Sequence, residues 1–188
     1  MRIGIYDPYL DDVGGGEKYM LTVAECLSES HDVTLFWDDI SNLQLAKERF
    51  GLPLEKVRLA QNIFSPKVGF LTKLLETKKY DAIIVLSDGS VPFSLSKKLF
   101  LHLQRPIKGA AQGLKSKFKL SRVNKVFCNS YFTKSFIDKQ AGVDSVVVYP
   151  PVRLKPKKVK KENIILHVGR LRVMDVTVGV KDYKKQYV

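Results

Sequence analysis

Residues 11–27 read DDVGGGEKYMLTVAECL, in which three consecutive glycines precede a helical pattern. From Met20 to Leu27, apolar residues recur at i, i+3, i+4 and i+7, which places them on one face of a helix. The run RIGIYD (2–7) before this stretch is short and apolar, as strands often are. The chain therefore opens with a strand, a glycine-rich loop and a helix. The glycines require an explanation, because glycine loses more entropy on ordering than any other residue.

Five further segments are short and mostly apolar, with many Val, Ile, Leu and Phe residues. They are HDVTLFW (31–37), YDAIIVLS (80–87), KLFLHLQ (98–104), KVFCN (125–129) and SVVVYP (145–150). Near-continuous apolarity is typical of strands that are covered on both faces of a sheet.

Helical patterns lie between several of these strands. PKVGFLTKLLETKK (66–79) begins with a proline, which suits a first helical turn. SYFTKSFIDKQAG (130–142) has Asn129 or Ser130 as its N-cap and Gly142 as its end. Alternation of strands and helices predicts an α/β fold, a Rossmann-like parallel sheet flanked by helices.

A change of composition predicts the domain organisation. Residues 153–163 contain six Lys or Arg, one Pro and little to bury, which is typical of a linker. IILHVGRL (164–171) then looks like an opening strand. We expect a Rossmann-like domain over 1–152, a basic linker over 153–163, and the truncated start of a second domain over 164–188.

Charge is the abnormal quantity of this chain, with a formal net charge of +13. Residues 97–125 contain nine Lys or Arg and no acid. A surface of one sign attracts phosphates, anionic lipids or nucleic acid, and a solvated face without a partner is the alternative. No run of about 18 apolar residues and no signal peptide is present, so we expect a cytoplasmic protein. Cys26 and Cys128 match no metal-site spacing and are predicted to be buried, reduced thiols.

The glycines follow the first strand, at the edge of the sheet where ligands of open α/β folds bind. A phosphate or a sugar hydroxyl resting against Gly14, Gly15 and Gly16 would explain them, because bare backbone permits close approach. A sharp turn that requires positive φ is the alternative explanation. Tyr19 stands where a dinucleotide fingerprint needs its third glycine, and Lys18 is not followed by Ser or Thr as in a P-loop.

Several motifs in one order resemble a known family. They are GGGEKY (14–19), HLQRP (102–106), CNSYFTKSFI (128–137), VVYPPV (147–152) and ILHVGR (165–170). This combination resembles the N-terminal half of a retaining glycosyltransferase of family 4 (group 1) with the GT-B fold. The similarity is greatest to mannosyltransferases that extend lipid-linked oligosaccharides.

The resemblance implies two domains that face each other across a cleft and bind different substrates. The N-terminal domain would hold the acceptor, a glycan or a lipid-linked sugar, and the C-terminal domain a nucleotide-sugar such as GDP-mannose. Transfer would need no metal or other cofactor. Gly14, Gly15 and Gly16 would approach the donor phosphate and sugar. His102 would contact the transferred sugar, although a strand-end histidine satisfied by backbone is the alternative.

The resemblance also assigns residues beyond the first domain. Arg170 would bind the donor diphosphate, with Lys184 or Lys185 as its partner. The family's two donor-site glutamates have no counterpart in this sequence, so we expect no sugar transfer by the 188-residue chain alone.

A lipid-linked acceptor would bring the domain to the cytoplasmic face of an anionic membrane. Within GLKSKFKLSRV (113–123), Lys115, Lys117, Phe118 and Lys119 form a short interfacial pattern that would face the membrane or the acceptor. A purely solvated face is the alternative for this segment.

Three other functions compete with the glycosyltransferase. A nucleic-acid-binding domain agrees with the basic charge, but no RNA-recognition motif or zinc-finger spacing is present, so no nucleic-acid partner is expected. An NAD-dependent oxidoreductase lacks the third glycine of its fingerprint. A non-catalytic carbohydrate-binding or regulatory domain would share every feature of the N-terminal half.

Overall fold

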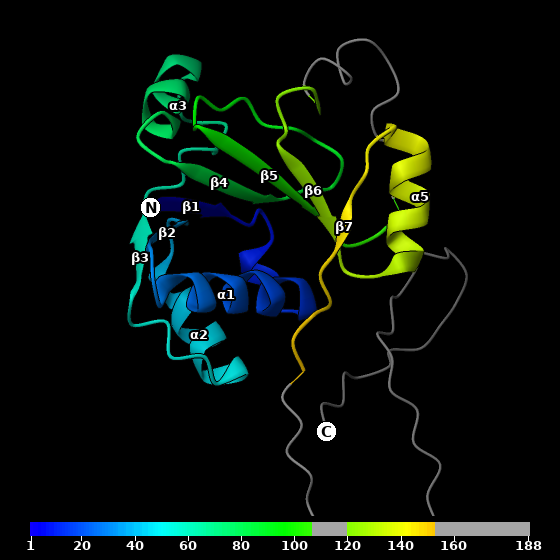
Figure 1. Ribbon diagram of the computed structural model, residues 1–188. Helices are drawn as coiled ribbons and strands as arrows, with labels where there is room; N and C mark the ends of the chain where they lie inside the picture. Colours follow the sequence, from blue (N-terminus) through cyan, green and yellow to red (C-terminus); the bar gives the residue numbers. More distant parts are fainter. Residues whose placement is uncertain (107–119, 153–188) are drawn as a thin grey trace, which may run out of the picture. The chain divides into compact units, whose positions relative to one another are not determined.

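The structure is a computed structural model that describes residues 1–106 and 120–152. Seven strands form one sheet in the order β3-β2-β1-β4-β5-β6-β7, and every neighbouring pair is parallel (Figure 1). The strands are β1 (Arg2–Tyr6), β2 (Asp32–Phe36), β3 (Val57–Ala60), β4 (Ala82–Leu86), β5 (Lys98–Leu103), β6 (Lys125–Cys128) and β7 (Val146–Val147). The predicted α/β class and Rossmann-like sheet are therefore confirmed.

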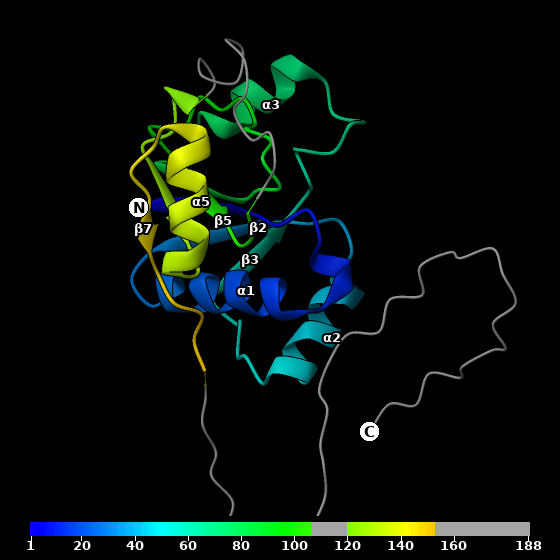
Figure 2. The ribbon, with the colours of Figure 1, turned by 90° about the vertical axis from the view of Figure 1, so that its right-hand side faces the viewer.

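Helices cover both faces of this sheet. They are α1 (Gly15–Ser28), α2 (Ile40–Phe50), α3 (Phe70–Thr77) and α5 (Tyr131–Ala141), and a short 3-10 turn, η1 (Leu10–Asp12), precedes α1. α1 and α2 lie on one face, and α3 and α5 lie on the other (Figures 1 and 2). Parallel strands need such crossover helices, which explains why the strands are apolar on both sides.

The core consists of two apolar layers, one on each face. Alternate residues of a strand point to opposite faces, so Ile84 of β4 joins the α1 layer while Ile83 and Val85 join the other layer. Gly4 of β1 is required by packing, because a Cβ there would lie 2.5 Å from a ring carbon of Phe36. The sheet is thus anchored on both sides before any functional residue is placed.

Two elements lie where the sequence analysis predicted nothing, and one helix begins later than predicted. α2 is capped by Asp39, whose side chain accepts from the Ser41 amide at 2.8 Å, and it ends at Gly51 with φ of +62°. β3 follows α2 at the edge of the sheet. The prediction that Pro66 opens the next helix is wrong, since α3 begins at Phe70 after a turn.

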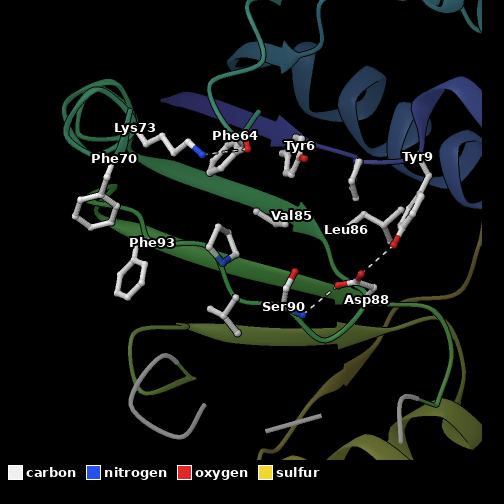
Figure 3. A pocket seen from close by; sticks show the side chains of 13 residues that line it. Tyr6, Tyr9, Phe64, Phe70, Lys73, Val85, Leu86, Asp88, Ser90 and Phe93 are labelled. Atoms are coloured by element: carbon white, nitrogen blue, oxygen red, sulfur yellow. Dashed lines mark hydrogen bonds between the residues drawn. The ribbon is translucent and has the colours of Figure 1, made fainter. Parts of the chain in front are cut away.

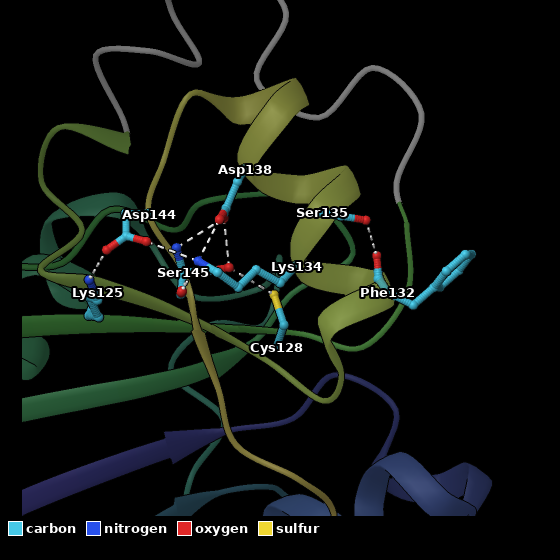
Figure 4. A network of polar contacts seen from close by, with 8 residues as sticks. All are labelled: Lys125, Cys128, Phe132, Lys134, Ser135, Asp138, Asp144 and Ser145. Atoms are coloured by element: carbon cyan, nitrogen blue, oxygen red, sulfur yellow. Dashed lines mark hydrogen bonds and ion pairs between the residues drawn. The ribbon is translucent and has the colours of Figure 1, made fainter.

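α5 has the ends that were predicted, and a polar network ties it to β7. The Ser130 hydroxyl accepts from the Thr133 amide at 3.1 Å, and Gly142 ends the helix with φ of +64°. Lys134 bonds Asp138 at 2.6 Å and Asp144 at 2.9 Å (Figure 4). These residues satisfy one another, which indicates a structural role.

The thiol prediction is half correct. Cys128 is buried beside this network, with its Sγ 3.5 Å from the Ser145 hydroxyl, but Cys26 is exposed. Cys26 lies on the solvent side of α1, so its burial was wrongly predicted. Both cysteines are free thiols.

The predicted linker 153–163 and second-domain segment 164–188 lie outside the described residues. Within the described ranges, no helix combines the length and the apolarity that crossing a bilayer requires.

Candidate functional site at the carboxyl edge of the sheet

The strand order reverses direction between β1 and β4. From β1 the chain proceeds outward to β2 and β3, and from β4 it proceeds the other way to β5, β6 and β7. Loops after β1 and β4 therefore separate at the carboxyl edge, and open α/β sheets bind ligands in the crevice so formed. Polar residues follow the strands at this edge, namely Asp7, Asp88, Gln104 and Asn129.

A pocket of about 360 Å³ lies at this switch point (Figure 3). It is lined by Tyr6, Pro8, Tyr9, Phe64, Phe70, Lys73, Val85, Leu86, Asp88, Ser90, Val91, Pro92 and Phe93. The loops after β1 and β4 supply two walls, and α3 with the segment before it supplies a third. The volume falls in the range of small-ligand sites.

The two ends of the pocket differ in polarity, as Figure 3 shows. At one end, the rings of Phe70 and Phe93 meet edge to face with their centroids 5.6 Å apart. At the other end, Asp88 accepts from the Tyr9 hydroxyl at 3.1 Å and from the Ser90 amide at 3.2 Å. The Ser90 amide holds the pKa of Asp88 below its ordinary value, so its carboxylate is charged at neutral pH.

The wall between these ends is aromatic. Tyr6 stacks on Phe64 with ring centroids 4.6 Å apart, and the Lys73 Nζ donates to the Phe64 carbonyl at 3.3 Å. The arrangement combines flat apolar surfaces with a few polar groups at one end. A ligand with apolar ring faces and several hydroxyls would match both features.

The glycine loop starts α1 beside this pocket, but its amides are partly engaged. The Glu17 carboxylate accepts from the Gly14 amide at 2.6 Å. A Cβ on Gly16 would lie 2.6 Å from Gln104 Oε1, whereas a Cβ on Gly15 would meet nothing within 4 Å. The positive-φ explanation of these glycines is wrong, because the left-handed residue here is Val13, with φ of 45°. Close packing explains Gly16, and open space remains at Gly15.

Asp7 is the buried carboxyl group between β1 and this loop. Its Oδ1 accepts from the Tyr9 amide at 2.9 Å, and its Oδ2 has no hydrogen-bond partner among the described residues. Burial raises the pKa of Asp7 to about 7, and the negative charge of Glu17 acts in the same direction. Asp11 and Asp12 of η1 add to this negative potential. The edge near the glycines is therefore acidic.

His102 of β5 is fully buried behind the glycine loop. Its ring is stacked between Tyr19 of α1 and Phe127 of β6, with centroid distances of 4.3 and 4.5 Å. Its Nδ1 lies 3.3 Å from the Phe127 carbonyl, and its Nε2 has no partner within the described ranges. Burial lowers the pKa of His102 to about 4, so the ring is neutral at pH 7.

The structure thus brings some predicted residues together and leaves others undescribed. Gly16 meets the residue after β5, since Gln104 Nε2 donates to the Gly16 carbonyl at 3.3 Å. Asn129 donates to the Gln104 carbonyl at 2.9 Å and so links β5 to β6.

Arg170, Lys184 and Lys185 lie outside the described residues, as do Lys115, Lys117, Phe118 and Lys119. In the described part of the chain, no group of three or more His, Cys, Asp or Glu residues could hold a metal ion.

The pocket itself was not predicted from the sequence. Asp7 ends the first apolar run, and SDGS (87–90) follows the third, so polar residues after strands were a usable indication. Phe64 and Phe93 lie in irregular segments, and no periodicity marks them. Their convergence depends on how α3 packs.

Comparisons with known proteins do not identify a family for this chain. No protein-family model matches it, and no curated protein matches it. The function therefore has to be argued from the site.

Proposed function

We propose that residues 1–152 form the acceptor-binding domain of a retaining glycosyltransferase, and that the switch-point pocket holds the acceptor sugar. The single observation that carries the proposal is the charged carboxylate of Asp88 at one end of an aromatic pocket. Sugar rings have apolar faces that pack on aromatic rings, and their hydroxyls donate to carboxylates. The family resemblance of the motifs supports the same activity.

The donor in this proposal is a nucleotide-sugar such as GDP-mannose, which approaches the glycine loop from the far side of the cleft. Glu17 and the two acids of η1 add negative potential beside the loop, while Asp7, whose pKa is raised to about 7, is only partly ionised at neutral pH. A diphosphate would be repelled there, so the sugar hydroxyls are the part of the donor that this loop accommodates. Gly15, which faces open space, is the position of closest approach.

The acidic edge also weakens the main alternative, a nucleic-acid-binding domain. A phosphate backbone requires basic side chains at its binding surface. The pocket offers Lys73 near its aromatic wall, but it has Asp88 at its polar end. We therefore do not propose nucleic acid as the partner of this pocket.

A binding experiment tests the proposal without requiring transfer. The ¹⁵N-labelled chain is titrated with mannose-containing disaccharides and, separately, with a uridine oligonucleotide. We expect the disaccharide to shift the amide resonances of Tyr9, Asp88 and Ser90. Asp88→Asn should weaken binding about tenfold, because it removes a charge-assisted hydrogen bond.

Glu55→Gln is the matched control, since it removes one exposed carboxylate outside the pocket and should leave the affinity unchanged. Equal effects of the two variants, or no shifts with any disaccharide, would contradict the proposal. Shifts at the pocket with the oligonucleotide alone would favour the nucleic-acid-binding alternative.

A further inference from the structure

α3 contributes almost nothing to the core, although it is rich in apolar residues. Of its eight residues only Thr77 is buried, while Leu71 and Leu75 are 73% and 63% exposed. A helix that packs on a sheet normally turns its apolar stripe inward. Here two leucines one turn apart face solvent, and Phe70 beside them is exposed as well.

The exposed apolar surface continues onto the segment before β5. Phe93 and Leu95 are exposed, and both lie against α3. The ring of Phe93 meets that of Phe70, and the Leu95 amide donates to the Thr77 hydroxyl at 3.0 Å. We call this surface the α3 patch; it consists of Phe70, Leu71, Leu75, Phe93 and Leu95.

The segments that form the α3 patch are positively charged. Residues 65–80 contain four lysines and one acid, and residues 93–98 contain two lysines, of which Lys97 is paired with Asp81 at 2.6 Å. The acid, Glu76, is paired with Lys79 at 2.6 Å. Exposed leucine and phenylalanine side chains with lysines around them match the interface of a bilayer that carries anionic lipids.

The α3 patch is continuous with the pocket, since Phe70 and Phe93 belong to both. A bilayer on the patch would therefore adjoin the apolar end of the pocket, at the opposite end from Asp88. A lipid-linked sugar would fit a pocket with its apolar end at the bilayer and its polar end away from it. Its lipid stays in the membrane while its sugar reaches hydrogen-bonding groups.

We propose that the α3 patch docks the domain on the surface of an anionic lipid bilayer. The docking stands on the patch itself, and only the delivery of a lipid-linked acceptor rests on the proposed glycosyltransferase function. The patch is separate from Lys115, Lys117, Phe118 and Lys119, which lie outside the described residues.

Vesicle flotation of the full 188-residue chain tests the docking. Vesicles of phosphatidylcholine, with and without phosphatidylglycerol, contain no glycan, so the result is independent of sugar binding. We expect binding to the anionic vesicles. The double variant Leu71→Gln with Leu75→Gln should weaken it about tenfold, because two inserted apolar side chains are lost. Lys78→Glu should weaken it about fivefold on anionic vesicles alone.

Ile40→Gln with Leu45→Gln is the matched control on α2, where the two side chains are 60% and 51% exposed. This control and the pocket variant Asp88→Asn should retain vesicle binding. No binding of the unmodified chain, or equal losses in the α3 and α2 variants, would overturn the proposal. It would also be overturned if the α3 variant abolished self-association in sedimentation while vesicle binding persisted, since the patch would then contact a second copy.

Discussion

The glycine loop and the switch-point pocket lie at one edge of the sheet. The space around the loop is packed with side chains, whereas the pocket is open. Behind the glycine loop, His102 is buried between two aromatic rings, and Glu17 and Gln104 occupy the near side of the loop. The pocket beside it has open space of about 360 Å³. The recognisable motif thus marks the packed side of the edge, and the open side has no motif.

A recognisable motif can therefore arise from packing as well as from ligand contact. Tyr19 shows how, because its ring fills the space between α1 and the sheet where a dinucleotide fingerprint has glycine. Its hydroxyl donates to the Val148 carbonyl at 3.0 Å and joins α1 to the chain after β7. Four predictions test how far the residues on the glycine-loop side of the edge support the fold.

The largest effect is expected for Tyr19→Ala, which removes a buried ring from the stack with His102. The free energy of unfolding should fall by about 3–5 kcal/mol, as for other buried aromatic residues. Tyr19→Phe keeps the ring and should cost about 1 kcal/mol for the lost hydrogen bond. Urea denaturation measures both values. Equal costs for the two variants would show that the ring does not support the fold.

Asp7→Asn should change the pH dependence of stability. Because the folded-state pKa of Asp7 is raised to about 7, its neutral form stabilises the fold at low pH, and this contribution is lost as the pH rises from about 4 through 7. The variant should therefore gain about 2–4 kcal/mol relative to the unmodified chain at pH 8. Chemical denaturation at pH 4 and pH 8 measures the difference, and the same ΔΔG at both values would contradict it.

His102→Phe should also change the pH dependence of stability, but its gain should appear at low pH. The depressed pKa of His102 means that its neutral form contributes stability above about pH 6.5, which is lost as the pH falls toward 4. Phe keeps a ring in the stack and cannot be protonated, so the variant should be about 2 kcal/mol more stable than the unmodified chain at pH 5. At pH 8 the two should be similar. A large loss of stability at pH 8 would instead indicate that a ring nitrogen makes an essential contact, such as that of Nδ1 with the Phe127 carbonyl.

The smallest effect is expected for Gly15→Ala. Its Cβ would enter open space at the start of α1, so the free energy of unfolding should rise by about 0.4–1 kcal/mol. Gly16→Ala is the comparison, since its Cβ would displace the Gln104 side chain. Thermal unfolding distinguishes the two variants. A destabilising Gly15→Ala would show that the space at this position is already needed by the fold.

Much of the fold could be predicted because its elements have local causes. The apolar runs of β1 and β4 correspond to strands buried on both faces, and Ser130 and Gly142 bound α5 through hydrogen bonds and backbone conformation within a few residues. α2 was missed because it buries only Leu43 and Ala46, so its apolar pattern is weak. α3 was placed too early because proline suits a turn as well as a first helical turn.

The α/β class, the strands themselves and the position of the glycines after the first strand could be inferred from the amino-acid sequence alone, because each depends on patterns among neighbouring residues. Which side of the edge is open depends on the packing of the folded chain. Burial of Asp7 and His102, the meeting of Gly16 with Gln104, and the exposure of Leu71 and Leu75 all depend on contacts between residues far apart in the chain. Such contacts set desolvation and free space, and no local pattern encodes either quantity.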